Sequence, residues 1–144
     1  PLYSSAASDV YKRQVFAHLC PSPQNGAMQS TDPRSITAPE LQRWLDGDGL
    51  SPRLVDVRED SEVQIAPFPG DVLHLPLSRS SDWMETVLSQ LTDDRAVVVL
   101  CHAGLRSQHF GLWLLAQNPT LDVWNLEGGI AAWSLQVDPA VPRY

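Results

Sequence analysis

An unbroken run of apolar residues, Ala96 to Leu100 (AVVVL), restricts the possible folds of this chain more than any other segment. A strand with one face in water alternates apolar and polar side chains. A continuous β-branched run is instead typical of a strand covered on both faces. Such strands occur in parallel sheets, where crossover helices pack against each face. The run therefore predicts an α/β domain built around a buried central strand.

The segments around this run alternate between strand and helix patterns. Further strands are predicted at residues 53–57, 72–75 and 122–126. Helices are predicted from the capping box Thr37-Ala38-Pro39-Glu40 to Gly47, from the cap Ser81 to Leu91, from Ser107 to Gln117, and from Gly128-Gly129 through Trp133. Strands that alternate with helices predict a doubly wound parallel sheet with helices on both faces.

The domain is expected to occupy residues 34–144 of the 144-residue chain. Residues 1–33 show no sustained period and are rich in serine and proline, so they are interpreted as an irregular leader. The chain begins at Pro1, and residues 1–14 are either a non-native remnant or a natural disordered segment. Neither alternative assigns chemistry to the leader.

Charge and cysteine content exclude several classes of protein. The net charge of -7 argues against a nucleic-acid partner, which requires a basic face. No apolar run approaches the roughly 20 residues that span a bilayer, so no membrane partner is expected. The two cysteines, Cys20 and Cys101, are too few for a disulfide scaffold and fit a cytoplasmic location. His18 and Cys20 lack further ligands nearby, so no metal site is predicted.

The chemistry is predicted at Cys101, which follows the buried strand and opens the loop CHAGLRS. Ligands of open α/β sheets bind beyond the carboxyl ends of the strands. A helix start offers free N–H groups and the positive end of a dipole. These groups and Arg106 are expected to favour the thiolate, which is the nucleophilic form of cysteine. The alternative is a buried structural cysteine at a strand end.

The spacing within this loop restricts the reaction. Four residues separate Cys101 from Arg106, which gives Cys-x4-Arg. Cysteine phosphatases use the longer Cys-x5-Arg loop, which surrounds a tetrahedral phosphate. The shorter loop is expected to fit a smaller group, such as one sulfur atom held on the thiolate.

Five segments carry a resemblance to a known family, in the expected order. They are Ile36-Thr37-Ala38-Pro39-Glu40-Leu41, Leu54-Val55-Asp56-Val57-Arg58-Glu59, Pro69-Gly70 with His74-Leu75-Pro76-Leu77, the CHAGLRS loop, and Asn125-Leu126-Glu127-Gly128-Gly129-Ile130 with Trp133. Over about residues 35–137 the chain resembles a single-domain rhodanese, of the thiosulfate sulfurtransferase family.

The resemblance implies a rhodanese-like fold and a two-step reaction without a cofactor. Cys101 would take the sulfane sulfur of a donor such as thiosulfate, and cyanide or a thiol would remove it from the persulfide. Arg106 and Arg58 match family arginines, and either could pair with the sulfonate oxygens of thiosulfate. The loop amides would hold the outer sulfur, and they belong to His102, Ala103, Gly104, Leu105, Arg106 and Ser107.

The chain also departs from the family pattern. Ala66-Pro67-Phe68 stands where Gly-His-Ile is frequent, and Asp71 replaces an alanine. Ala103 occupies a position where some efficient thiosulfate enzymes carry lysine. Two alternatives stay open: a phosphatase or arsenate reductase that uses the same cysteine and arginine, and a non-catalytic rhodanese-like docking module.

Two residues near the loop have structural interpretations. Asp56 is expected to brace Arg58 or the loop as a hydrogen-bonding carboxylate rather than to act as an acid or base. His102 is expected to point outward while its amide faces the sulfur, with a role as general base as the alternative. The sequence leaves the physiological donor and acceptor, any protein partner and the oligomeric state open.

Overall fold

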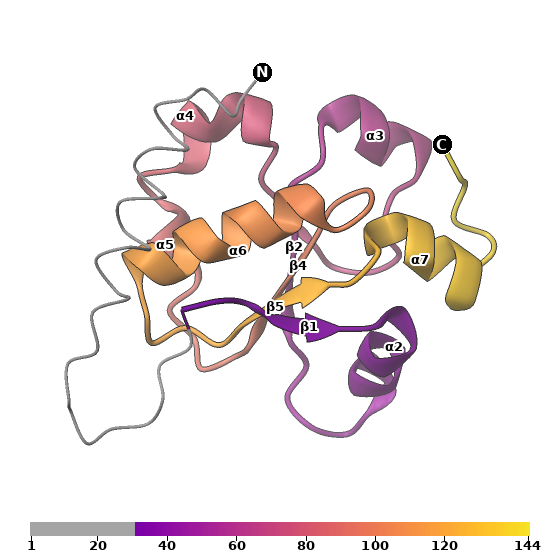
Figure 1. The fold of residues 1–144 in the computed structure, drawn as a ribbon, viewed down its shortest axis with the longest axis horizontal. Coiled ribbons are helices and arrows are strands. Elements are labelled where there is room, and N and C mark those ends of the chain that lie inside the picture. The colour runs from indigo at the N-terminus through magenta and orange to yellow at the C-terminus, as the bar shows by residue number, and fades with distance from the viewer. Residues whose placement is uncertain (1–30) are drawn as a thin grey trace.

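The computed structural model describes residues 31–144, so most of the predicted leader, with His18 and Cys20, lies outside the described residues. Five parallel strands form one sheet in the order β1-β5-β4-β2-β3, with β4 at its centre (Figure 1). The strands are β1 (Arg34–Ile36), β2 (Arg53–Asp56), β3 (Leu73–His74), β4 (Val97–Leu100) and β5 (Val123–Leu126). The predicted doubly wound α/β sheet is confirmed.

Helices cover both faces of this sheet (Figure 1). They are α2 (Ala38–Asp46), α3 (Asp60–Ile65), α4 (Ser80–Trp83), α5 (Val87–Gln90), α6 (Leu105–Gln117) and α7 (Gly129–Gln136), with a 3-10 turn η1 (Leu77–Arg79) before α4. Within residues 31–144, no helix has both the length and the apolar character that crossing a membrane requires.

The central strand β4 is buried along its whole length, as its composition predicts. Successive side chains of a strand point to opposite faces of the sheet. Val97 and Val99 pack with α4, α5 and α6 on one face, while Val98 and Leu100 pack with α2 and α7 on the other. Each face of the sheet therefore has its own apolar core. The helices that connect the strands lie on both faces.

The capping box at the start of α2 is present as predicted. The Glu40 amide donates to the Thr37 hydroxyl at 3.4 Å, and the Thr37 amide donates to the Glu40 carboxylate at 2.9 Å. These contacts satisfy N–H groups that have no partner inside the helix. The helix ends at Gly47, also as predicted.

The single helix predicted from Ser81 to Leu91 is wrong. The structure has two short helices, α4 and α5, and Arg79 rather than Ser81 precedes the first of them. Thr86 breaks the segment because its amide and its hydroxyl both bond back to the carbonyl of Trp83, at 3.0 and 3.3 Å. Side chains of this kind compete with the helical pattern of hydrogen bonds.

The start of one helix and the presence of another also differ from the sequence expectations. The helix α6 begins at Leu105, two positions before the predicted start at Ser107. The helix α3 was not predicted, because none of its residues is buried and it therefore shows no apolar period.

Candidate active site

Cys101 lies directly beyond β4, at the carboxyl edge of the sheet, and is only 1% exposed. Gly104 immediately precedes α6 with φ of +104°, a conformation that favours glycine. This turn directs the Gly104 amide at the Cys101 Sγ, to which it donates at 3.0 Å. The predicted placement of the thiol at the start of a helix is thus present in the structure.

The Ser107 hydroxyl connects Cys101 to the neighbouring strand β5. Its Oγ lies 3.2 Å from the Cys101 Sγ and donates to the Asn125 Oδ1 at 2.5 Å. The Asn125 Nδ2 in turn donates to the Gly104 carbonyl at 3.0 Å. Because a hydroxyl has one proton, a Ser107 that donates to Asn125 accepts from the Cys101 S–H. Ionisation of the thiol removes that donor, and Ser107 can then donate to Sγ when its proton turns from the Asn125 Oδ1 to the sulfur.

The helix α7 holds the first residues of the loop from the opposite side. The Ile130 amide donates to the Cys101 carbonyl at 2.8 Å, and the Ala131 amide donates to the His102 carbonyl at 3.1 Å. Gly129 lies so close that a Cβ atom built on it would be 2.4 Å from the Cys101 carbonyl oxygen. The close approach of these two segments therefore requires glycine at position 129.

The Arg106 guanidinium is held by a carboxylate from α3. Its Nη1 and Nη2 donate to the two carboxylate oxygens of Glu62, each at 2.7 Å. This bidentate pair lowers the pKa of Glu62 to about 2. Glu62 raises the pKa of Arg106, to which the charge of Cys101 also contributes. Arg106 is therefore electrostatically coupled to the thiol, but both of its terminal nitrogens already have an anionic partner.

Arg58 has no exposed surface and also has an anionic partner. Its Nε and Nη2 donate to the Asp56 carboxylate at 3.0 and 2.7 Å, and its Nη1 donates to the Tyr144 hydroxyl at 3.0 Å. Burial opposes the charge of this guanidinium, but the bonds with Asp56 and Tyr144 raise its pKa. The expected bracing of Arg58 by Asp56 is confirmed. A direct contact of Arg58 with substrate stays a prediction.

Tyr144 joins the two ion pairs. Besides accepting from Arg58, its hydroxyl donates to the Glu62 Oε1 at 3.2 Å. Its ring packs on the imidazole of His102, with 4.5 Å between ring centroids. The structure thus places one phenol between the two arginines that match family positions.

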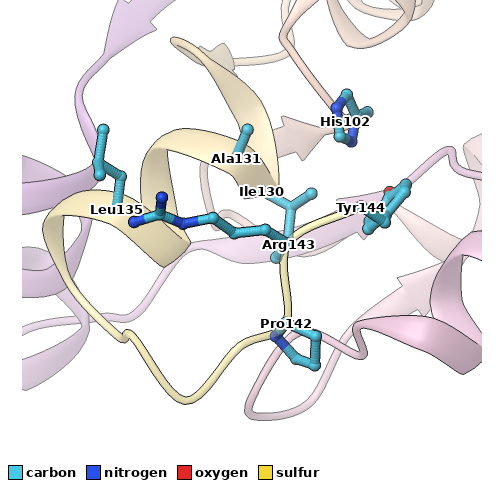
Figure 2. A pocket seen from close by; sticks show the side chains of 7 residues that line it. All are labelled: His102, Ile130, Ala131, Leu135, Pro142, Arg143 and Tyr144. Carbon is cyan, nitrogen blue, oxygen red and sulfur yellow. The ribbon is translucent and has the colours of Figure 1, made fainter.

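The His102 imidazole faces a hollow of about 270 Å³ at the carboxyl edge (Figure 2). The walls come from α7 and the segment after it, with Ile130, Ala131, Leu135, Pro142, Arg143 and Tyr144. This orientation agrees with the expected outward direction of the side chain. The role of His102 as a base is untested.

The seven residues of the predicted loop run from the end of β4 into the first turn of α6, which holds Leu105, Arg106 and Ser107. Cys101 and Ser107 are buried, His102, Gly104 and Arg106 are partly buried, and Ala103 and Leu105 are exposed. Their assignments as donor-binding residues stay predictions. Within residues 31–144, no cluster of three or more His, Cys, Asp or Glu side chains is placed to hold a metal ion.

Three residues of the site were not predicted from the sequence: Glu62, Asn125 and Tyr144. Asn125 gave a local signal, because it is a polar residue in the otherwise apolar strand Val123–Leu126. Glu62 and Tyr144 gave none, since they contact Arg106 and Arg58 across 44 and 86 positions of sequence.

This arrangement is suited to a nucleophilic thiol that carries a small group. A backbone N–H and a hydroxyl lie within hydrogen-bond distance of Sγ, and the N-terminal end of α6 adjoins it. Such donors stabilise negative charge on sulfur. The loop spans four residues between the cysteine and the arginine.

Known proteins are similar to this chain in sequence and in fold. The family model described as the rhodanese-like domain matches residues 37–136. The chain is 40% identical over 92 residues to the Rhodanese-like/PpiC domain-containing protein 12, chloroplastic, of Arabidopsis thaliana, covering 64% of this chain and 30% of that protein. It is 32% identical over 129 residues to the Probable adenylyltransferase/sulfurtransferase MoeZ of Mycobacterium tuberculosis, covering 90% and 32%.

A solved structure supports the same assignment. The crystal structure of a rhodanese-like domain protein from Staphylococcus aureus matches with a TM-score of 0.58 and 29% identity, covering 69% of this chain and 90% of that one. The chain spans about a third of the length of the two curated relatives named above. With the family model matching 100 consecutive residues, the chain belongs to the rhodanese-like domain family.

Proposed function

We propose that this domain is a sulfurtransferase in which Cys101 carries a sulfane sulfur from a donor such as thiosulfate to a thiophilic acceptor, cyanide or a thiol. The observation that carries the proposal is the position of the Cys101 Sγ. It lies at the N-terminal end of α6, with the Gly104 amide donating to it at 3.0 Å and the Ser107 hydroxyl 3.2 Å away.

The proposed reaction has two steps. The Cys101 thiolate attacks the outer sulfur of thiosulfate, a new S–S bond forms on the cysteine, and the S–S bond of thiosulfate breaks as its electron pair leaves with sulfite. The acceptor then attacks the outer sulfur of the persulfide and restores the thiolate. Each step exchanges one bond to sulfur for another, so neither an external oxidant nor a reductant is needed.

Two features favour this reaction over phosphoryl transfer. The loop is one residue shorter than that of cysteine phosphatases, and a relative carries sulfurtransferase in its name. The docking-module alternative is disfavoured because Cys101 is retained with hydrogen-bond donors around it. The phosphatase alternative is tested with p-nitrophenyl phosphate. It predicts that the protein hydrolyses this compound and that Cys101→Ser does not.

The proposal is tested by mass spectrometry of the protein after treatment with a sulfane donor, followed by a thiosulfate:cyanide transfer assay. We expect a gain of about one sulfur mass on the peptide that contains Cys101. Cys101→Ser should abolish both the gain and the transfer, while the matched control Cys20→Ser should retain them. Transfer that persists in Cys101→Ser, or no gain with any sulfane donor, would overturn the proposed function.

The compartment and the partners are part of the same proposal. The scarcity of cysteine supports a reducing compartment, for which we propose the cytoplasm. The proposed partners are a small sulfur-containing anion as donor and cyanide or a thiol as acceptor.

A further inference from the structure

Both arginines expected to bind the sulfonate group of thiosulfate are neutralised by carboxylates. Glu62 takes both terminal nitrogens of Arg106 at 2.7 Å, and Asp56 takes the Nε and Nη2 of the fully buried Arg58. The remaining nitrogen of Arg58 donates to the Tyr144 hydroxyl. Each positive charge beside the loop thus has a negative partner within hydrogen-bond distance.

The other cationic groups near this edge do not restore the balance. Arg79 is paired with Asp60 at 3.0 Å, and the Nδ1 of His74 lies 3.7 Å from the same carboxylate. Arg143 belongs to the hollow beside His102, but its guanidinium lies at the Leu135 end, away from the His102 ring (Figure 2). Once Cys101 ionises, the thiolate adds a negative charge that no unpaired guanidinium of the loop offsets.

We propose that Glu62 determines the donor specificity of this site: by occupying Arg106 it disfavours dianionic thiosulfate and favours organic sulfane donors that carry a single negative charge. This inference rests on the proposed function, since it concerns the donor of the same persulfide. A dianion that approaches an anionic nucleophile is repelled unless a cation compensates. A monoanion meets about half of that repulsion, so it has less need of the guanidinium.

Glu62 acts as a specificity residue without touching the reacting sulfur. It lies on α3, and the Tyr144 hydroxyl donates to its Oε1 at 3.2 Å in addition to the two bonds from Arg106. The Glu59 amide adds a fourth bond at 2.9 Å, and with a pKa of about 2 the Glu62 carboxylate stays charged at neutral pH. Arg106 is therefore held away from a substrate anion by a fixed, ionised partner.

The methanethiosulfonate anion is the matched probe for this proposal. It replaces one charged oxygen of thiosulfate by a methyl group, so the two donors differ by one negative charge at similar size. With either donor the Cys101 thiolate forms an S–S bond to the outer sulfur, and the S–S bond of the donor breaks. The electron pair leaves with sulfite in one case and with methanesulfinate in the other.

The experiment measures kcat/KM for both donors with cyanide as acceptor, in the full chain and in three variants. Glu62→Gln removes the charge but keeps a side chain of the same size. Glu62→Asp keeps the charge. Asp93→Asn removes one negative charge at the opposite end of the sheet, where Asp93 pairs with Arg53 and Arg95, and controls for net charge.

We expect Glu62→Gln to raise the ratio of kcat/KM for thiosulfate to kcat/KM for methanethiosulfonate about tenfold, since Arg106 then has no competing anion. Glu62→Asp and Asp93→Asn should leave this ratio within about twofold of the wild type. A ratio that is unchanged or lower in Glu62→Gln, or that rises equally in Asp93→Asn, would overturn the inference.

The two proposals fail in different ways. If neither donor adds sulfur to Cys101 in the wild type, the proposed function fails. If both donors form the persulfide but Glu62→Gln does not change the ratio, only the assignment of Glu62 fails. Circular dichroism of each variant before the assay verifies that the fold is retained, and Glu62→Asp provides the charge-retaining comparison.

Discussion

Replacing Gly129 by alanine tests whether the contact between α7 and the Cys101 loop supports both the fold and the chemistry. Gly129 has φ of +60°, and an added Cβ would lie 2.4 Å from the carbonyl oxygen of Cys101 and 2.5 Å from that of His102. Both oxygens are backbone atoms that accept hydrogen bonds from α7, so neither can move without loss. The methyl group therefore forces the loop and the helix apart.

The expected cost follows from two effects. A left-handed conformation costs a non-glycine residue roughly 1–2 kcal/mol, and forcing an extra methyl group into a packed region typically costs about 1–3 kcal/mol. Together they predict a loss of about 3 kcal/mol, a substantial part of the roughly 5–15 kcal/mol that stabilises a domain. For a domain of this size the melting temperature should fall by about 10–15 °C.

Thermal unfolding followed by circular dichroism measures the effect, with Gly49→Ala as the matched control. A Cβ added at Gly49 meets no atom within 4 Å, so that variant should melt within about 2 °C of the wild type. The rate of persulfide formation should also fall in Gly129→Ala, because the carbonyl of Cys101 is displaced. If the two variants melt at the same temperature, the contact does not have the energetic role we derive from it.

Three further predictions concern the residues around the loop. Asp56→Asn leaves Arg58 buried without its counter-ion and should lower the free energy of unfolding in urea by about 3–5 kcal/mol. The control Asp60→Asn, in an exposed pair, should lower it by under about 1 kcal/mol. Equal losses in the two variants would contradict this prediction. The pKa of Glu62 is lowered from 4.5 to about 2, so its contribution, on the order of 3 kcal/mol, is present above pH 4.5 and lost as pH falls towards 2. Glu62→Gln should therefore flatten the dependence of unfolding free energy on pH in this range, and parallel curves would refute the pairing. Ser107→Ala removes a hydroxyl 3.2 Å from Sγ and should slow persulfide formation about 10- to 100-fold; an unchanged rate would show that the hydroxyl does not support the thiolate.

The parts of the fold that were predictable from sequence depend on local patterns. The apolar run of β4 and the capping box of α2 each lie within a few residues, and both are present. Two other segments show where such patterns fail. The helix α3 buries none of its residues and so has no apolar period, and Thr86 interrupts a segment whose period predicted one helix.

The site follows the same division. Cys101, Ser107 and Arg106 belong to one short loop, so the sequence alone gives their spacing and indicates their shared chemistry. The partner of the loop arginine has no such local signal, because Glu62 lies 44 positions earlier and is brought to Arg106 only by the packing of α3. A donor anion that binds Arg106 must therefore compete with Glu62, a partner that only the tertiary structure reveals.

The two hydrogen bonds from α7 also determine the polarity of the turn around Cys101. In a planar trans peptide the C=O and the following N–H point in opposite directions. Because the carbonyls of Cys101 and His102 point toward the Ile130 and Ala131 amides, the N–H groups of His102 and Ala103 point away from α7. An anion-binding turn requires its donors inward and its acceptors elsewhere. Here α7, which begins 28 positions after Cys101, holds the carbonyls of Cys101 and His102 toward itself. A helix outside the loop therefore orients the peptide dipoles of the loop.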